Sequence, residues 1–258
     1  LVFTILCLGL GISSYSSAES NSLEDVFNEQ INTYYSINGF YNFSANQGAH
    51  KDLDDINEST DKLKTLFASL KTASKGSSTE EEFTTVESNW NTYLKLLNQN
   101  IKEVKRSGYP DLRLAGDMAG ANIVLNNALA SFYKTLLKNK TTKPNKFTDL
   151  GREAAVNIGL MLTKYSARST STVSQVYADS TIEVTIDELA NQFEKQIVNL
   201  MELTKERPVA FKLLDSAHTK WEFIKSSYIN YNENRVNFIV NLYSRRIIAD
   251  ITEALAVK

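Results

Sequence analysis

Apolar residues recur every three or four positions over long stretches of this chain, and this spacing constrains the fold more than any other feature. Between Glu80 and Val104 they draw a single stripe along a helix, formed by Phe83, Val86, Trp90, Tyr93, Leu94, Leu97, Ile101 and Val104. A second one-sided stripe near the C-terminal end consists of Val236, Ile239, Val240, Tyr243, Ile247, Ile251 and Leu255. The 258 residues include only 10 Gly and 3 Pro, so few turn formers interrupt such stripes. The sequence therefore predicts an all-α fold of long amphipathic helices.

Capping residues indicate where several of these helices begin and end. Ser78 with Glu81, and Thr185 with Glu188, have the spacing of a capping box, in which two side chains satisfy free backbone N–H groups at a helix start. Gly108 is placed to end a helix, because glycine tolerates the left-handed backbone of a C-cap. These signals predict helix starts near residues 79 and 186 and a helix end near residue 107.

The predicted helices fall into two sets of four. We expect them over residues 22–46, 51–74, 79–107, 111–138, 146–169, 183–206, 208–231 and 233–256. The run Thr181–Thr185 is the one credible strand alternative, and we interpret it as a loop. Four amphipathic helices with short loops close into an up-down-up-down bundle. The polar, basic segment around Pro144 is typical of a domain boundary. We therefore predict two tandem antiparallel four-helix bundles that, with their linker, cover residues 19–138, 139–146 and 147–258.

A repeated pattern around the two tryptophans predicts that the bundles are related by internal duplication. Trp90 and Trp221 each fall in the third helix of a set. The positions seven and four residues before each Trp are apolar, and they hold Phe83 and Val86 or Leu214 and Ala217. An aromatic-aliphatic pair follows each Trp, one residue sooner in the second half, as Tyr93-Leu94 and Phe223-Ile224.

The first 18 residues have the character of a signal peptide. Residues 1–12 are apolar and uncharged, and as a helix they would span about 18 Å, too short for a bilayer core of roughly 30 Å. Small residues follow at Ser16 and Ala18, so we expect cleavage after Ala18. An uncleaved anchor, or a lipoprotein acylated at Cys7, is the alternative. We predict a bacterial periplasmic or secreted protein with no membrane span after signal cleavage.

Composition and motifs argue against several functions. The net charge is −2, with acids and bases interspersed, so no basic stripe is available for nucleic acid. Cys7 is the only cysteine, which excludes an internal disulfide and a cysteine-based metal site. The sequence has no G-x-S-x-G, H-E-x-x-H or P-loop motif. We therefore predict that the protein is not an enzyme and has no cofactor.

Two further groups of residues have a functional and a structural interpretation. His218 follows Asp215 by three residues, on one face of a predicted helix, and the two side chains could supply ligands to a metal. Di-iron bundles need several glutamates and two Glu-x-x-His motifs, which are missing, so we interpret His218 as structural or solvated and predict no metal site. Tyrosines could likewise line a pocket. We instead assign to a bundle core the aromatic group Tyr34, Tyr35, Phe40, Tyr41 and Phe43.

The fifth predicted helix resembles part of a known sensor family. Residues 150–157 (LGREAAVN) are similar to the opening of the motif A-G-R-Q-R-M-L-S-Q-R-M, whose end falls near Met161, Lys164 and Tyr165. With the four-helix plan and a Trp in the third helix, the chain resembles the periplasmic sensor bundle of type IV pilus chemotaxis transducers (PilJ type), related to the nitrate sensors of the NarX type. It departs from the motif where the family has Arg, Gln and Arg, at Ala154, Ile158 and Gly159.

The resemblance implies an extracytoplasmic domain that senses a small ligand or an envelope signal. The residues it implies for binding a small anion or metabolite lie along one helix, at Arg152, Glu153, Asn157 and Lys164. In the family a transmembrane helix and a signalling region follow the bundle, so an envelope or transducer protein is an implied partner. We expect a stand-alone sensor-like domain. The alternative is a structural or interaction protein of the cell envelope with no small-molecule ligand.

Overall fold

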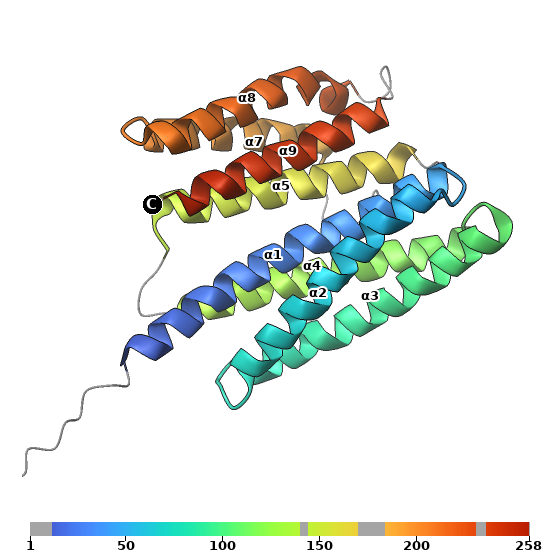
Figure 1. Ribbon diagram of the computed structural model, residues 1–258, viewed down its shortest axis with the longest axis horizontal. Helices are drawn as coiled ribbons and strands as arrows, with labels where there is room; N and C mark the ends of the chain where they lie inside the picture. The colour runs from blue at the N-terminus through green and yellow to red at the C-terminus, as the bar shows by residue number, and fades with distance from the viewer. Residues whose placement is uncertain (1–11, 140–143, 170–183, 231–235, 258) are drawn as a thin grey trace, which may run out of the picture.

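Every element in the described part of the chain is an α-helix, so the all-α prediction is confirmed. The computed structural model describes residues 12–139, 144–169, 184–230 and 236–257 (Figure 1). In chain order the helices are α1 (Ile12–Ala45), α2 (His50–Ser74), α3 (Glu80–Ser107), α4 (Leu112–Asn139), α5 (Lys146–Ser169), α7 (Ile186–Leu203), α8 (Pro208–Ile229) and α9 (Asn237–Ala256). Their bounds follow the predicted ranges closely, except that α1 starts well ahead of residue 22.

Parts of the predicted signal peptide, linker and loop lie outside the described residues. These parts are residues 1–11, 140–143 and 181–183, whereas residues 12–18 form the start of α1. Cleavage after Ala18 and the position of the linker therefore stay predictions. Within the described ranges, no helix has both the length and the apolarity that a bilayer crossing requires.

Two of the predicted helix-end signals are confirmed in atomic detail. Gly108 caps α3 with a left-handed φ of 83°, and its N–H donates to the carbonyl of Val104. Thr185 caps α7 in a complete capping box, because its hydroxyl accepts from the N–H of Glu188 while the Glu188 carboxylate accepts from the N–H of Thr185. Both signals depend only on local chemistry, which is why the sequence was sufficient to predict them.

The capping box predicted at Ser78 and Glu81 is wrong. Helix α3 has Thr79 as its N-cap, and no side chain there makes the capping hydrogen bond. The Ser78 hydroxyl instead accepts a hydrogen bond from Asn139 at the end of α4, at 3.1 Å. The N-cap is thus one residue later than the pattern predicts, and the N–H of Thr79 donates locally to Ser77 Oγ at 3.2 Å.

The first four helices pack around one core, and the last four pack around another. Helix α1 contacts α2 and α4, and α3 contacts the same two helices, which closes a ring of four. In the second set, α5 and α8 each contact both α7 and α9. The fully buried large side chains include Tyr41, Tyr93 and Phe132 in the first core and Tyr165, Phe193 and Trp221 in the second. This packing is consistent with the two predicted bundles.

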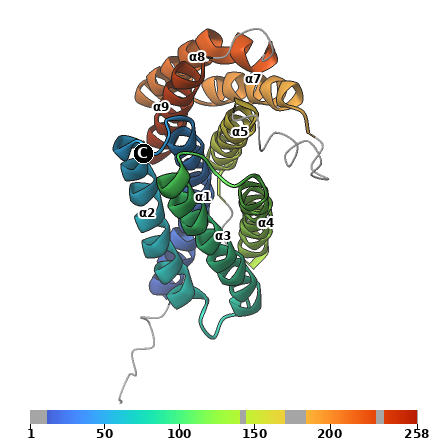
Figure 2. The same cartoon turned by 90° about the vertical axis from the view of Figure 1, so that its right-hand side faces the viewer.

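The helices α1 and α5 join the bundles by running side by side in parallel (Figures 1 and 2). Three contacts fix their register. The Arg152 guanidinium lies 5.7 Å from the ring centroid of Phe27, Gly159 lies against Tyr34, and Asn38 Nδ2 donates to Thr163 Oγ1 at 3.1 Å. The partners in each pair are 125 residues apart in sequence, and this constant offset requires a parallel arrangement.

Gly159 allows this close approach of α1 and α5. A Cβ atom built on Gly159 would lie 2.7 Å from Tyr34 Cδ2, which is closer than real Cβ contacts come. Helix α1 even contributes to the second core, where Phe27 and Ile31 join the residues of α5. The two bundles are therefore packed against each other through their first helices.

Both tryptophans occupy the core beside an aromatic ring from the preceding helix. Trp90 on α3 stacks on Phe67 of α2, with centroids 4.9 Å apart, and Trp221 on α8 meets Phe193 of α7 edge-on at 4.8 Å. The aromatic-aliphatic pairs that follow the two tryptophans are less alike than predicted. In the second bundle Phe223 is 62% exposed and only Ile224 is buried. The shared helix order and the two Trp positions agree with a duplication, which remains a prediction.

Candidate functional site

A pocket of about 380 Å³ lies where the N-terminal half of α5 faces α1 and the C-terminal half of α4. Its apolar lining consists of Phe27, Ala130, Leu137 and Val156. Its polar lining consists of Gln30, Tyr133, Lys134, Asp149, Arg152 and Glu153. The pocket thus combines an apolar wall with a few polar groups, which is typical of small-molecule sites. Helices of both bundles contribute to it.

Arg152 is one of two cations in the polar lining, beside Lys134. Its Nη1 donates to the Tyr133 hydroxyl at 3.2 Å, and its guanidinium lies over the ring of Phe27. These contacts from α4 and α1 hold a side chain that α5 supplies. Among the described residues no carboxylate forms an ion pair with Arg152. A guanidinium has five N–H donors, so most of its capacity remains for a ligand or for water.

Of the four residues implied by the family resemblance, the structure brings two to this pocket. Arg152 and Glu153 both line it, although Glu153 also accepts from Gln192 Nε2 at 3.3 Å. Asn157 is buried inside the second bundle, where it donates to the Leu189 carbonyl and to Gln196, both at 3.1 Å. Lys164 is buried too, and its ammonium donates to the carbonyl of Val184 at 2.8 Å. Asn157 therefore joins α5 to α7, Lys164 joins α5 to the segment before α7, and neither residue lines the pocket.

The three departures from the family motif have a physical explanation. Ala154 and Ile158 have no exposed surface, because both belong to the second core. Gly159 lies where α5 packs tightly against Tyr34 of α1. Long polar side chains would have no room at these positions.

The aromatic group on α1 contributes to packing, as expected. Tyr34, Phe40, Tyr41 and Phe43 are at most 5% exposed. Only Tyr35 is partly accessible. The guanidinium of Arg245 from α9 packs over its ring, 4.6 Å from the centroid. This stacking adds a contact between the bundles, on the side of α1 that meets α9.

A second pocket, between α1 and α2, is larger but less suitable for binding a small molecule. It measures about 710 Å³, and its charged lining residues are exposed. Two of its acids already have partners on the same helix, because Lys62 pairs with Glu58 and Lys64 pairs with Asp61, each at 2.7 Å. Its charges can therefore be satisfied without a ligand.

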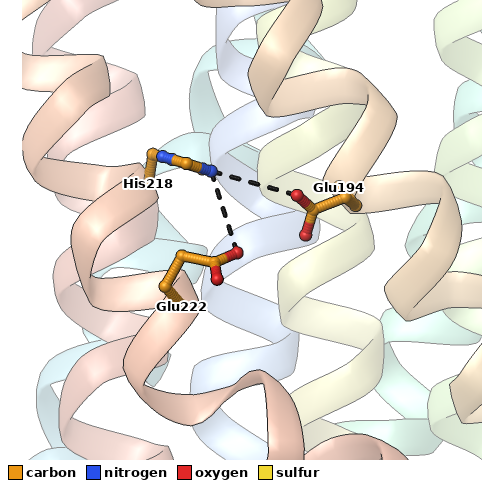
Figure 3. A group of neighbouring side chains, drawn as sticks. All are labelled: Glu194, His218 and Glu222. Carbon is orange, nitrogen blue, oxygen red and sulfur yellow. Dashed lines mark ion pairs between the residues drawn. The ribbon is translucent and has the colours of Figure 1, made fainter.

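The structure also brings together a group of possible metal ligands that the sequence did not suggest. His218 and Glu222 on α8 point towards Glu194 on α7 (Figure 3), and one donor atom of each residue lies within 4.8 Å of the others. Asp215, the partner considered from sequence, is exposed and is not part of this group. The four-residue spacing of His218 and Glu222 was visible in the sequence, but Glu194 is supplied by another helix, so only the fold could place it there.

Comparison with protein-family models, with curated proteins and with solved structures finds no match for this chain.

Proposed function

We propose that the protein contains a sensor-like domain that binds a small anion with an apolar body in the pocket between its two bundles. The observation that carries this proposal is Arg152, a positioned guanidinium without a carboxylate partner among the described residues, beside an apolar wall. A carboxylate or a similar oxyanion is the natural ligand of such a group, because it accepts two parallel N–H bonds. The apolar part of the ligand would lie against Phe27, Leu137 and Val156.

The position of the pocket suggests how binding could be read out. Phe27 comes from α1, Tyr133 from α4 and Arg152 from α5, so an occupant would touch both bundles at once. A ligand shifts an equilibrium only by as much as its affinity differs between the two states. A ligand in this pocket would bind best when α1 and α5 are correctly packed, and it would therefore stabilise one relative placement of the bundles. A partner in the envelope, such as a transducer, would detect that placement.

A screen of small anions by thermal unfolding tests the proposal. The compounds are aliphatic and aromatic carboxylates, nitrate and phosphate esters, each added to the purified protein. A ligand that binds only the folded state at 100 times its Kd stabilises it by about 2.7 kcal/mol, which raises Tm measurably. Arg152→Ala should weaken binding of any hit roughly 10- to 100-fold, because hydrogen bonds to charged groups contribute about 1.5–3 kcal/mol.

Arg113→Ala is the matched control, because Arg113 is an exposed arginine on α4. It should bind the hit as the natural chain does. Circular dichroism of both variants must show the same helix content, so that a loss of binding is not a loss of folding. The proposal fails if no compound raises Tm, or if Arg152→Ala retains full affinity.

A second candidate function is a structural or interaction role in the cell envelope without a small-molecule ligand. The observation in its favour is exposed aromatic surface on the last two helices, where Phe223 is 62% and Phe238 is 73% exposed. The ring centroids of Phe223 and Tyr243 are 5.1 Å apart, so part of this surface is contiguous. A stoichiometric envelope partner that is lost in Phe223→Ser, in a protein without any ligand hit, would favour this function.

We also propose that the protein is exported and that its sensor-like plan is shared with the PilJ and NarX types. The support for export is the apolar run of residues 1–12 followed by Ser16 and Ala18. N-terminal sequencing of the exported protein should then begin at Glu19, and a retained Leu1 segment would contradict cleavage. The support for the shared plan is the 150–157 motif and the four-helix packing. Relatives that keep the fold but lack the 150–157 motif would weaken the proposal of a shared plan.

We infer, further, that the two bundles arose by internal duplication. The support is the equivalent place of Trp90 and Trp221, each beside a ring of the preceding helix. Alignment of the two halves within related sequences tests this inference. Halves that show no similarity beyond helical periodicity would contradict it.

A further inference from the structure

The group Glu194, His218 and Glu222 has the geometry of an open metal site on the surface of the second bundle (Figure 3). His218 and Glu222 are four residues apart on α8, so they lie on one face of that helix. His218 Nε2 is 3.8 Å from Glu222 Oε1 and 3.9 Å from Glu194 Oε1, which reaches it from α7. The side chains are 29%, 50% and 31% exposed in that order, so an ion in solution can reach all three.

The donor set and its spacing match a small divalent ion. One imidazole nitrogen and two carboxylate oxygens suit Zn²⁺, which forms bonds of about 2.0–2.2 Å to such ligands and commonly keeps a water in an open position. Ligands of a tetrahedral zinc ion lie about 3.3 Å apart at those bond lengths. His218 Nε2 therefore needs to approach each carboxylate oxygen by only about half an ångström. The three donor atoms lie within 4.8 Å of one another, so the two carboxylates must also draw together, which rotations of part-exposed side chains can provide.

The Glu194 carboxylate is already oriented for this role. Its Oε2 accepts from the indole N–H of the fully buried Trp221 at 2.6 Å, which leaves Oε1 to face His218. Burial alone would raise the pKa of Glu194. The hydrogen bonds from Trp221 and Lys225, with the positive charge of Lys225, outweigh it and lower the pKa. The hydrogen bond from the buried Trp221 holds the Glu194 carboxylate in place, and this arrangement typically orients a metal ligand.

Lys225 is the competing cation at this place. Its ammonium lies 3.0 Å from Glu194 Oε2 and 3.3 Å from Glu222 Oε1. A bound ion would take Glu222 Oε1 and displace the ammonium from that oxygen. The Lys225 side chain is 34% exposed and four carbons long, so it can turn into solvent. The contact with Glu194 Oε2 can persist, because the ion would use the other oxygen.

We infer that Glu194, His218 and Glu222 bind a divalent transition-metal ion, with Zn²⁺ as the best match, and that the ion clamps α7 to α8. Water would complete the coordination shell. An ion that binds only the folded chain raises its stability, and here the gain would fall on the second bundle. The site is separate from the pocket around Arg152, so the inference is independent of the proposed function.

The test is a titration of the purified, chelator-treated protein with ZnCl₂, followed by calorimetry and by fluorescence. A Trp90→Phe background leaves Trp221 as the only indole, and Trp221 donates to Glu194, so a bound ion should change its emission. One ion per chain is expected. His218→Ala and Glu222→Gln should each weaken binding at least about tenfold. Lys225→Met should tighten it about two- to fivefold, since it removes a part-exposed competing ion pair.

His50→Ala is the matched control, because His50 is the only other histidine and is exposed. It should leave the affinity unchanged. Equal Zn²⁺ binding by the natural chain and His218→Ala would overturn the inference, as would the absence of saturable binding below about 1 mM. A site that appears only in Lys225→Met would also overturn it, because Lys225 would then be the resident cation of the natural protein.

Discussion

Trp90 and Trp221 hold corresponding places in the two bundles, yet the residues three positions before them meet the preceding helix differently. In the first bundle this residue is Glu87, which closes the gap between α2 and α3 through an ion pair with Lys71 at 2.7 Å. In the second it is His218, which faces two carboxylates on α7 and α8. The position three residues before the Trp therefore forms a simple ion pair in the first bundle. In the second bundle it belongs to a group of possible metal ligands.

The interiors of the bundles differ as well. The first bundle buries the Glu29 carboxyl completely, and neither oxygen has a hydrogen-bond partner among the described residues. In the second bundle the buried Tyr228 hydroxyl is paired with Ser244 at 2.7 Å, and Asn157 donates two hydrogen bonds. An uncompensated buried acid is costly and sensitive to pH. Both bundles bury some polar atoms without a hydrogen-bond partner among the described residues, but Glu29 of the first bundle is a carboxyl group of which neither oxygen has one.

Replacing either tryptophan by alanine is expected to have the largest effect on stability. Both side chains are buried, so Trp90→Ala and Trp221→Ala should each lower the free energy of unfolding by about 3–5 kcal/mol. Each variant keeps one Trp, which then reports on the unfolding of the other bundle. Because Phe27 and Ile31 of α1 belong to the second core, we expect a single coupled transition.

The measurement is urea unfolding followed by Trp fluorescence and by circular dichroism. Coincident curves would show that the bundles unfold together. If the remaining Trp unfolds at a much higher urea concentration than the helix signal is lost, the two bundles are independent, and their contact through α1 and α5 contributes little.

The sequence was sufficient for the helices because their signals are local. Long apolar stripes, Gly108 and the Thr185–Glu188 box each act within a few residues, and all are found where predicted. The Ser78–Glu81 box failed because α3 takes Thr79 as its N-cap, one residue later than the pattern predicts, while the Ser78 hydroxyl bonds to Asn139. Local patterns therefore predict where helices end to within about a residue, but not always which residue caps them.

The sites were harder to predict because each depends on several helices. Arg152 stood out in the sequence, but the pocket beside it needs Phe27 from α1 and Tyr133 from α4. The possible metal site needs Glu194 from α7. Glu194 is too far from His218 in the sequence for helical periodicity to predict that the two side chains meet. Asn157 and Lys164 share the predicted helix with Arg152 yet face other neighbours. Helical periodicity predicts on which side of its helix a residue lies. It does not predict which other helix will pack against that side.

Gly159→Ala tests the contact between the bundles, with the next largest effect. A methyl group would lie 2.7 Å from Tyr34 Cδ2, so the buried Tyr34 ring or the two helices would have to shift. We expect a loss of about 1–3 kcal/mol in the free energy of unfolding, as for other overpacked sites. Gly120→Ala is the matched control on α4, because a Cβ there would meet nothing within 4 Å.

The control should gain about 0.4–1 kcal/mol, since alanine loses less backbone entropy in a helix than glycine does. Thermal and urea unfolding of both variants provide the comparison. If Gly159→Ala and Gly120→Ala change the free energy of unfolding equally, α1 and α5 are not tightly packed at Gly159.

The remaining effects concern pH, and they should have opposite signs in the two bundles. Burial, with a smaller contribution from Asp25, raises the pKa of Glu29 well above its usual value. The folded state then holds a proton that the unfolded chain releases, so this contribution to stability is full below about pH 4 and is lost as pH rises through the folded pKa. The slope in that range is at most about 1.4 kcal/mol per pH unit. Glu29→Gln should remove it and should make the protein more stable at neutral pH.

Glu194 should show the reverse. Its pKa is lowered, because the hydrogen bonds from Trp221 and Lys225 outweigh its burial, so its contribution is present above the unfolded pKa and lost as pH falls through the folded one. Urea unfolding between pH 4 and pH 8, with chelator present, compares each variant with the natural chain and with Glu24→Gln, an exposed control on α1. Glu29→Gln should gain stability over the natural chain as pH rises, whereas Glu194→Gln should lose it. Parallel curves for all variants would mean that the two bundles do not differ in how they hold their acids.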